Sequence, residues 1–104
     1  MTEEHKIMLE IMVAISQDCI IFRHNVGKVR TPDGRYFSTG IPAGYSDLQG
    51  HRKCDGRAVY IEVKTRYGRV SPEQKIFIDA MQKTGAIAGV CRSVDDAINL
   101  IQSK

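Results

Sequence analysis

The sequence predicts an α/β protein in which a mixed β-sheet is flanked by helices, in the order α-β-β-β-β-α-β-α. Three observations lead to this fold class. Apolar residues recur with helical periodicity near the N-terminus, in the third quarter of the chain and at the C-terminus. Short runs rich in β-branched residues are separated by Gly, Pro and Asp-Gly turns. A strand, a helix and another strand follow one another between residues 58 and 91, and such a crossover makes the two strands parallel.

Length and charge limit the class of protein. The 104 residues suffice for a single domain, residues 1–104, whose core needs no disulfides. The formal net charge of +3 suits a nucleic-acid partner without establishing one. The N-terminus is acidic and no apolar run reaches about 18 residues. We therefore expect no signal peptide, no membrane contact and an intracellular, cytoplasmic location.

The three cysteines are widely spaced and odd in number. Cys19 and Cys91 lie in apolar runs, which favours reduced and buried thiols over a disulfide. His51-x-x-Cys54 has the spacing of half a zinc site, but no second ligand pair follows it. We therefore expect no zinc.

Residues 3–17 are predicted to form the first helix. Thr2 can cap it, and Glu3 and Glu4 stand in the first turn, where the helix dipole favours negative charge. Its apolar residues cover more than half of the helical wheel, whereas one core-facing stripe needs little more than about 100°. We therefore expect a second face of this helix to pack against another element or another subunit.

A hairpin is predicted next. Residues 19–26 form a strand, residues 31–35 a Pro-Asp-Gly turn, and residues 36–38 a short returning strand. Lys28, Arg30 and Arg35 project from it. An ordinary basic loop and a nucleic-acid contact explain these charges equally well.

A second hairpin is predicted from the strands 47–52 and 58–65, which are joined by the turn Cys54-Asp-Gly-Arg57. The start of the first strand lies opposite the end of the second, so Asp47 should approach Glu62 and Lys64. This depends on register, because a slip of one residue would move Asp47 to the other face.

Glu62 and Lys64 should lie on one face of their strand, since side chains alternate along it. Two interpretations explain a carboxylate and an ammonium group there. One is a same-face ion pair on an edge strand. The other is a metal-dependent phosphodiesterase site, in which Glu62 holds a divalent cation and Lys64 steadies the attacking water or the developing charge.

The second half continues with a basic loop at residues 66–70 and a helix at residues 72–83. Ser71 is its predicted N-cap, and Gln74 has the position of the Glu or Gln in a capping box. A buried strand at residues 87–91 and a last helix at residues 94–102, capped by Ser93, complete the chain.

Taken in order, these motifs resemble those of the VRR-NUC family in the PD-(D/E)XK nuclease superfamily, whose small stand-alone members occur in phages and bacteria. The resemblance covers nearly the whole chain. The matching segments are Glu4 with Ile7, Asn25-Val-Gly27, Pro32-Asp-Gly-Arg-Tyr36, Gly40-Ile-Pro-Ala-Gly-Tyr-Ser-Asp47, Ile61-Glu-Val-Lys64, Gly68-Arg-Val-Ser-Pro-Glu-Gln74, Gly85-Ala-Ile-Ala-Gly-Val90 and Arg92-Ser-Val-Asp-Asp-Ala97. One departure from the superfamily pattern is Ser46, which stands where proline would precede Asp47.

The resemblance implies a restriction-endonuclease-like sheet and a role for each matching residue. Asp47, Glu62 and the backbone carbonyl of Val63 would hold Mg²⁺ or Mn²⁺, because hard cations prefer oxygen ligands. Lys64 would orient the attacking water. Glu4 is implied as a further acid near the metal, and Gln74 as a polar site residue rather than a cap alone.

The implied activity is that of a metal-dependent endonuclease, a hydrolase acting on the ester bonds of DNA. The stand-alone members suggest a homodimer that cuts branched DNA such as four-way (Holliday) junctions. Two alternatives stay open: a nuclease of this fold acting on other DNA or RNA, and an inactive nucleic-acid-binding module. Candidate phosphate contacts are Lys28, Arg30, Arg35, Arg52, Arg66 and Arg69.

Overall fold

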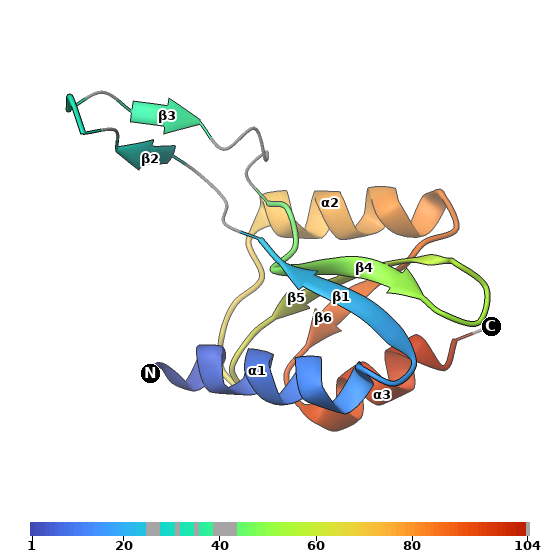
Figure 1. The fold of residues 1–104 in the computed structure, drawn as a ribbon. Helices are drawn as coiled ribbons and strands as arrows, with labels where there is room; N and C mark the ends of the chain where they lie inside the picture. The colour runs from blue at the N-terminus through green and yellow to red at the C-terminus, as the bar shows by residue number, and fades with distance from the viewer. Residues whose placement is uncertain (25–27, 31, 35, 39–43, 104) are drawn as a thin grey trace.

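The computed structural model describes residues 1–24, 28–30, 32–34, 36–38 and 44–103. Three helices and six strands occur in this part of the chain (Figure 1). In order they are α1 (Glu3–Ile15), β1 (Cys19–Arg23), β2 (Lys28–Arg30), β3 (Tyr36–Ser38), β4 (Leu48–Arg52), β5 (Ala58–Val63), α2 (Pro72–Lys83), β6 (Ile87–Cys91) and α3 (Val94–Ile101).

Four strands form one mixed sheet in the order β1-β4-β5-β6. β4 pairs antiparallel with β1 and β5, whereas β5 pairs parallel with β6, as the crossover through α2 predicts. Helices α1 and α3 lie on one side of this sheet and α2 on the other (Figure 1). The predicted α/β class with a mixed, helix-flanked sheet is confirmed.

The strand predicted at residues 19–26 is wrong in its extent. β1 ends at Arg23, and a further strand, β2, pairs antiparallel with β3 in a two-stranded sheet of its own. The predicted order therefore lacked one strand before α2. In Figure 1 the β2–β3 hairpin stands apart from the body of the protein. β2 and β3 have three residues each. Strands this short are too brief to show a clear alternation of apolar and polar residues in the sequence.

The core lies mainly between the sheet and the α1–α3 layer. Val59, Ile61 and Val63 of β5 are all fully buried, which confirms their predicted shared face. They pack with Ile11 and Ile15 of α1 in one cluster of buried side chains. Burying such an aliphatic side chain contributes about 1.5–3 kcal/mol. Because β5 is an interior strand, the predicted edge-strand position of the Glu62–Lys64 ion pair is wrong. The ion pair itself is present, with 3.8 Å between the Lys64 nitrogen and Glu62 Oε1.

Local signals for helix ends agree with the structure. The Thr2 hydroxyl accepts a hydrogen bond from the His5 N–H at 3.1 Å, and Ser93 caps α3 through Asp96 N–H at 3.1 Å. The predicted elements are one or two residues too long: α1 ends at Ile15, β5 at Val63 and α3 at Ile101. Such differences at the ends are ordinary.

Gly50 of β4 lies where a neighbouring backbone approaches closely. A Cβ atom at this position would lie 1.7 Å from the Ile20 carbonyl oxygen of β1, so no other residue fits without moving the strands. The three cysteines are free, and Cys19 and Cys91 are buried, as expected. Among the described residues, no helix combines the length and the apolar character needed to cross a bilayer.

Candidate active site

Two acidic residues meet where β4 begins and β5 ends. The register pairs Leu48 with Ile61, so Asp47 lies beside Glu62. The Asp47 N–H donates to Glu62 Oε2 at 3.3 Å, and the Val63 N–H donates to Asp47 Oδ2 at 2.8 Å. The structure therefore brings Asp47 and Glu62 together, although they stand 15 residues apart in the sequence.

Glu62 occupies an unfavourable position for an ionised carboxylate. Its side chain is 3% exposed. Burial, and then the negative charge of Asp47, raises its pKa from 4.5 to about 8, while the Lys64 ammonium acts in the opposite direction. Without a bound cation, the raised pKa therefore favours the protonated form of Glu62, and a cation placed between the two acids would favour the ionised form.

Gln74 takes part in the predicted capping box and also contacts Glu62. Its side-chain oxygen accepts from the Ser71 N–H at 2.9 Å, and the Ser71 hydroxyl accepts from the Gln74 N–H at 3.1 Å, which completes a capping box. Its amide nitrogen donates to Glu62 Oε1 at 2.7 Å. The first turn of α2 is thereby joined directly to the buried acid.

Lys64 lies one residue beyond β5, on the same face as Glu62. Its ammonium nitrogen is 3.8 Å from Glu62 Oε1, and its side chain is 14% exposed. The Lys64 N–H donates to the Cys91 carbonyl at 3.1 Å, which fixes the backbone at the end of the sheet. The charge of Lys64 is thus held beside the acid pair rather than in bulk solvent.

The segment that carries Asp47 is held at several points. Gly44 has φ +87° and lies against α2, where a Cβ would be 2.5 Å from the Glu73 carbonyl oxygen. Ser46 is 1% exposed and donates to the Leu48 carbonyl at 2.9 Å. The His24 N–H donates to the Asp47 carbonyl at 3.0 Å. Ser46 therefore fixes the turn locally at the position where the superfamily pattern has proline.

A cavity of about 470 Å³ lies between α1 and the end of the sheet, and of the acid pair only Asp47 lines it. Asp47, Val63 and Thr65 line it from the sheet, and Glu4 lines it from α1. Glu4 is exposed. Among the described residues, no three His, Cys, Asp or Glu side chains are grouped closely enough to hold a metal ion. Glu4 therefore shares the cavity with Asp47 but does not complete a three-carboxylate set.

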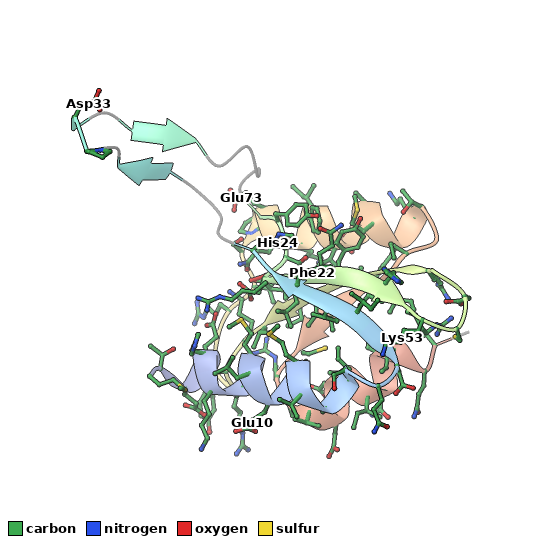
Figure 2. All side chains as sticks on the ribbon, in the orientation of Figure 1. Glu10, Phe22, His24, Asp33, Lys53 and Glu73 are labelled. Carbon is green, nitrogen blue, oxygen red and sulfur yellow. The ribbon has the colours of Figure 1, made fainter. Side chains whose placement is uncertain are left out.

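Arg23 and His24 belong to this cavity, and the sequence interpretation missed both. Arg23 is the last residue of β1 and His24 follows it, and Figure 2 labels His24 at the end of the β1 ribbon that lies towards Glu73 in the first turn of α2. The His24 Nε2 atom is buried without a hydrogen-bond partner in the described part of the chain. Two consecutive polar residues at the end of an apolar strand could have indicated this position in the sequence. Because the predicted strand continued to Val26, Arg23 and His24 were assigned to its interior.

The candidate phosphate contacts fall into three groups: two arginines on the loop after Lys64, three residues in the 28–35 segment, and Arg52 at the far end of β4. Arg66 and Arg69 are exposed on the loop that follows Lys64. The side chains of Lys28 and Arg30, and the whole of Arg35, lie outside the described parts of the chain.

Arg52 lies at the other end of β4, next to Lys53, which Figure 2 labels far from His24. Its guanidinium bonds both Asp55 carboxylate oxygens and the carbonyls of Ile101 and Ser103. These contacts tie the β4–β5 turn to the end of α3. We therefore leave Arg52 out of the proposed phosphate contacts.

The donor set fits one small, hard cation. Asp47 and Glu62 are adjacent carboxylates, so the ligands that these two side chains offer are oxygens. The pKa of Glu62 is raised because the protein alone does not offset the burial of Glu62 and the negative charge of Asp47. A bound cation would supply the missing positive charge. Mg²⁺ and Mn²⁺ match this chemistry.

The two bonds of the Gln74 side chain can be separated by mutation. Gln74→Ala removes the side-chain acceptor of the Ser71 N–H and the donor to Glu62, but the Ser71 hydroxyl can still accept from the backbone N–H of residue 74. Ser71→Ala removes that hydroxyl and leaves the Gln74–Glu62 bond possible. We expect each variant to lose about 1 kcal/mol of unfolding free energy, measured by urea denaturation. Only Gln74→Ala should also lower the rate of the DNA cleavage that the family resemblance implies. Equal rates for the two variants would limit Gln74 to a capping role.

Comparison with known proteins identifies the family to which the chain belongs. The VRR-NUC domain matches residues 16–95 of the chain. A solved structure described as a VRR_NUC domain protein superposes with a TM-score of 0.64 at 20% identity, over 98% of this chain and 87% of that chain. No curated protein sequence matches. The sequence match covers most of the chain, and the superposition shows the same fold, so the chain belongs to the VRR-NUC family of nucleases.

Proposed function

We propose that this nuclease domain is a metal-dependent endonuclease that hydrolyses DNA phosphodiester bonds, with branched DNA such as four-way junctions as its preferred substrate. The convergence of Asp47, Glu62 and Lys64 at one end of the sheet is the observation that carries the proposal. Two acids and an amine in this arrangement can hold a cation and keep a positive charge beside it.

Hydrolysis of a phosphodiester must overcome the negative charge of its oxygens and a poor leaving group. A bound Mg²⁺ or Mn²⁺ would neutralise this charge and lower the pKa of a water molecule. Asp47, Glu62 and the Val63 carbonyl are the residues that would hold the ion. Lys64 would orient the attacking water and stabilise charge that develops on the phosphate, because its ammonium group is already fixed near Glu62.

The proposed phosphate contacts flank this site. Arg66 and Arg69 stand on the loop after Lys64, and Arg23 lines the cavity beside Asp47. Contacts of this kind provide affinity and orientation but no sequence specificity. Lys28, Arg30 and Arg35 stay as proposed contacts from the β2–β3 region.

The first prediction tests the substrate and the metal together. Labelled four-way junctions, linear duplex, flapped DNA, single strands and RNA are incubated with the protein and Mn²⁺, with and without EDTA. We expect the four-way junction to be cut fastest and EDTA to stop all cleavage. Cleavage that survives EDTA contradicts the metal mechanism. Equal rates on junction and duplex contradict the preference, and binding without cleavage supports the inactive-module interpretation.

A homodimer would give a two-fold symmetric junction two sites. The outer face of α1 supports this assembly, since Leu9 is 39% exposed and Val13 is 75% exposed. With Glu10 and Ala14 they line a second, largely apolar hollow. The predicted second packing face of α1 therefore has no partner among the described residues, and another copy of the chain would cover it.

The second prediction concerns this dimer. Val13→Glu places a charge in the apolar face and should convert the dimer to a monomer in light-scattering measurements of mass. Gln17→Glu adds the same charge at an exposed position beyond α1 and should leave the mass unchanged. If wild-type protein is itself monomeric at micromolar concentration, the dimer proposal is wrong.

A further inference from the structure

The loop between β5 and α2 presents an aromatic ring to solvent directly after the candidate active site. Tyr67 is 84% exposed and lies three residues beyond Lys64. A single exposed aromatic residue is ordinary by itself. The surroundings of Tyr67 are less common, because the half-buried side chain of Arg92 holds the backbone on both sides of it.

Arg92 ties the loop to the end of β6. Its Nη1 donates to the carbonyls of Thr65 and Gly68, both at 2.7 Å, and to that of Arg66 at 3.4 Å. The Gly68 N–H donates to the Thr65 carbonyl at 3.1 Å, which closes a tight turn around Tyr67. One guanidinium nitrogen thus gathers the carbonyls on both sides of the ring. Holding a loop in its binding conformation reduces the entropy lost on binding.

The turn also lies against the active site. A Cβ on Gly68 would come within 3.4 Å of the Lys64 Cβ and Cδ atoms, so the turn packs on the stem of the Lys64 side chain. Thr65, the first residue of the turn, lines the cavity that contains Asp47. A ligand that contacts Tyr67 would therefore lie next to the bond that the proposed reaction breaks.

The charges around the ring indicate the class of ligand. The Arg66 guanidinium carbon lies over one face of the Tyr67 ring, 5.5 Å from its centre, so a base would stack on the opposite face of this exposed ring. Arg66 and Arg69 are both exposed on the same loop. An aromatic face flanked by cations suits a nucleotide, since the base can stack while the arginines neutralise phosphates. In a paired duplex, neighbouring base pairs cover the base faces, so only an unpaired base offers a free one.

We propose that Tyr67 is a stacking platform for an unpaired nucleobase of the substrate, with Arg92 as the residue that positions it. This inference rests on the proposed nuclease function and specifies what that site recognises: DNA with an unpaired base beside the cleaved phosphate, such as a base opened at the point where the arms of a four-way junction meet. Tyr67 is then a specificity-determining residue, and the loop distinguishes open or branched DNA from continuous duplex.

The absence of tryptophan from the sequence allows a direct test. Tyr67→Trp introduces a single reporter whose emission is quenched when a base stacks on it. His51→Trp is the matched control, because His51 is exposed on β4 at the end remote from Asp47. Both variants are titrated with forked DNA bearing unpaired thymines and with fully paired duplex, using Ca²⁺ in place of Mg²⁺ and a gel to verify intact DNA.

We expect forked DNA to quench Tyr67→Trp much more than duplex does, and neither DNA to quench His51→Trp. Tyr67→Ala should lower affinity for forked DNA about tenfold, with a clearly smaller loss on duplex. Tyr67→Phe, which retains the ring, should keep the wild-type preference.

Three outcomes overturn the inference. Equal quenching by both DNAs, or equal losses for Tyr67→Ala on both, means that the ring does not read unpaired bases. A changed molecular mass for Tyr67→Ala with unchanged DNA binding assigns the ring to a protein interface. In each of these three cases wild-type cleavage stays intact, so only this inference fails. If the wild-type protein neither binds nor cuts DNA, the proposed function fails and the inference fails with it.

Discussion

Lys64→Ala should lower the rate of DNA cleavage by a factor of about 10²–10³ and leave metal binding nearly unchanged. Removing a single preorganised charge-stabilising group at a reaction centre typically has an effect of this size. Lys64 is suited to that role because its ammonium nitrogen lies 3.8 Å from Glu62 and its side chain is only 14% exposed. A screened surface lysine would contribute far less.

Two further variants separate this role from simpler explanations. Glu62→Ala should weaken both cleavage and Mn²⁺ binding, measured by titration calorimetry, because it removes a proposed metal ligand. Lys83→Ala removes an exposed lysine from the last turn of α2 and should change neither quantity. If Lys64→Ala retains wild-type activity, the charge of Lys64 takes no part in the reaction.

The second large effect is a pH dependence of stability that originates in Glu62. The ordinary pKa is 4.5, and in the folded protein burial and the Asp47 charge raise it to about 8. Between these values the folded chain keeps a proton that the unfolded chain has released, so rising pH favours unfolding. The stabilising contribution is complete below pH 4.5 and disappears as the pH rises through about 8.

The melting temperature of the metal-free protein, measured in EDTA, should therefore fall between pH 5.5 and pH 8. Each kcal/mol lost corresponds to about 4–8 °C in a domain of this size. Glu62→Gln, which cannot ionise, should remove most of that fall. Glu73→Gln, a substitution of an exposed acid in the first turn of α2, should retain it.

Metal addition should reverse the effect. At pH 8, Mn²⁺ should raise the melting temperature of the wild-type protein, because a ligand that binds the folded state stabilises it by mass action. Glu62→Gln should respond much less. A wild-type melting temperature that is constant or rises with pH in EDTA would show that Glu62 is already ionised without metal.

Much of the fold followed from local patterns. The alternation of Val59, Ile61 and Val63 defined the buried face of β5, and Ser71 and Ser93 marked the starts of α2 and α3. The turn at residues 54–57 and the α2 crossover then fixed the antiparallel and parallel neighbours of β5. These signals are strong because each depends on residues only a few positions apart.

Other features could not be obtained this way. The end of β1 at Arg23 and the separate β2–β3 sheet depend on which strands find partners. The internal use of Arg52 depends on the C-terminal end of α3, about fifty residues away. The same holds for Arg92, which the sequence placed only at a strand–helix junction and which the structure joins to three carbonyls of the 65–68 turn.

By itself, the sequence determined the elements, the face that Glu62 shares with Lys64, and the motif order that identifies the family. The tertiary structure decided which acids meet. Asp47 reaches Glu62 through the β4–β5 register, whereas Glu4 lines the same cavity without joining them. The physical reason is that helix and strand periodicity are set by neighbouring residues, while contacts between distant residues depend on register and on how α1 and α2 pack against the sheet.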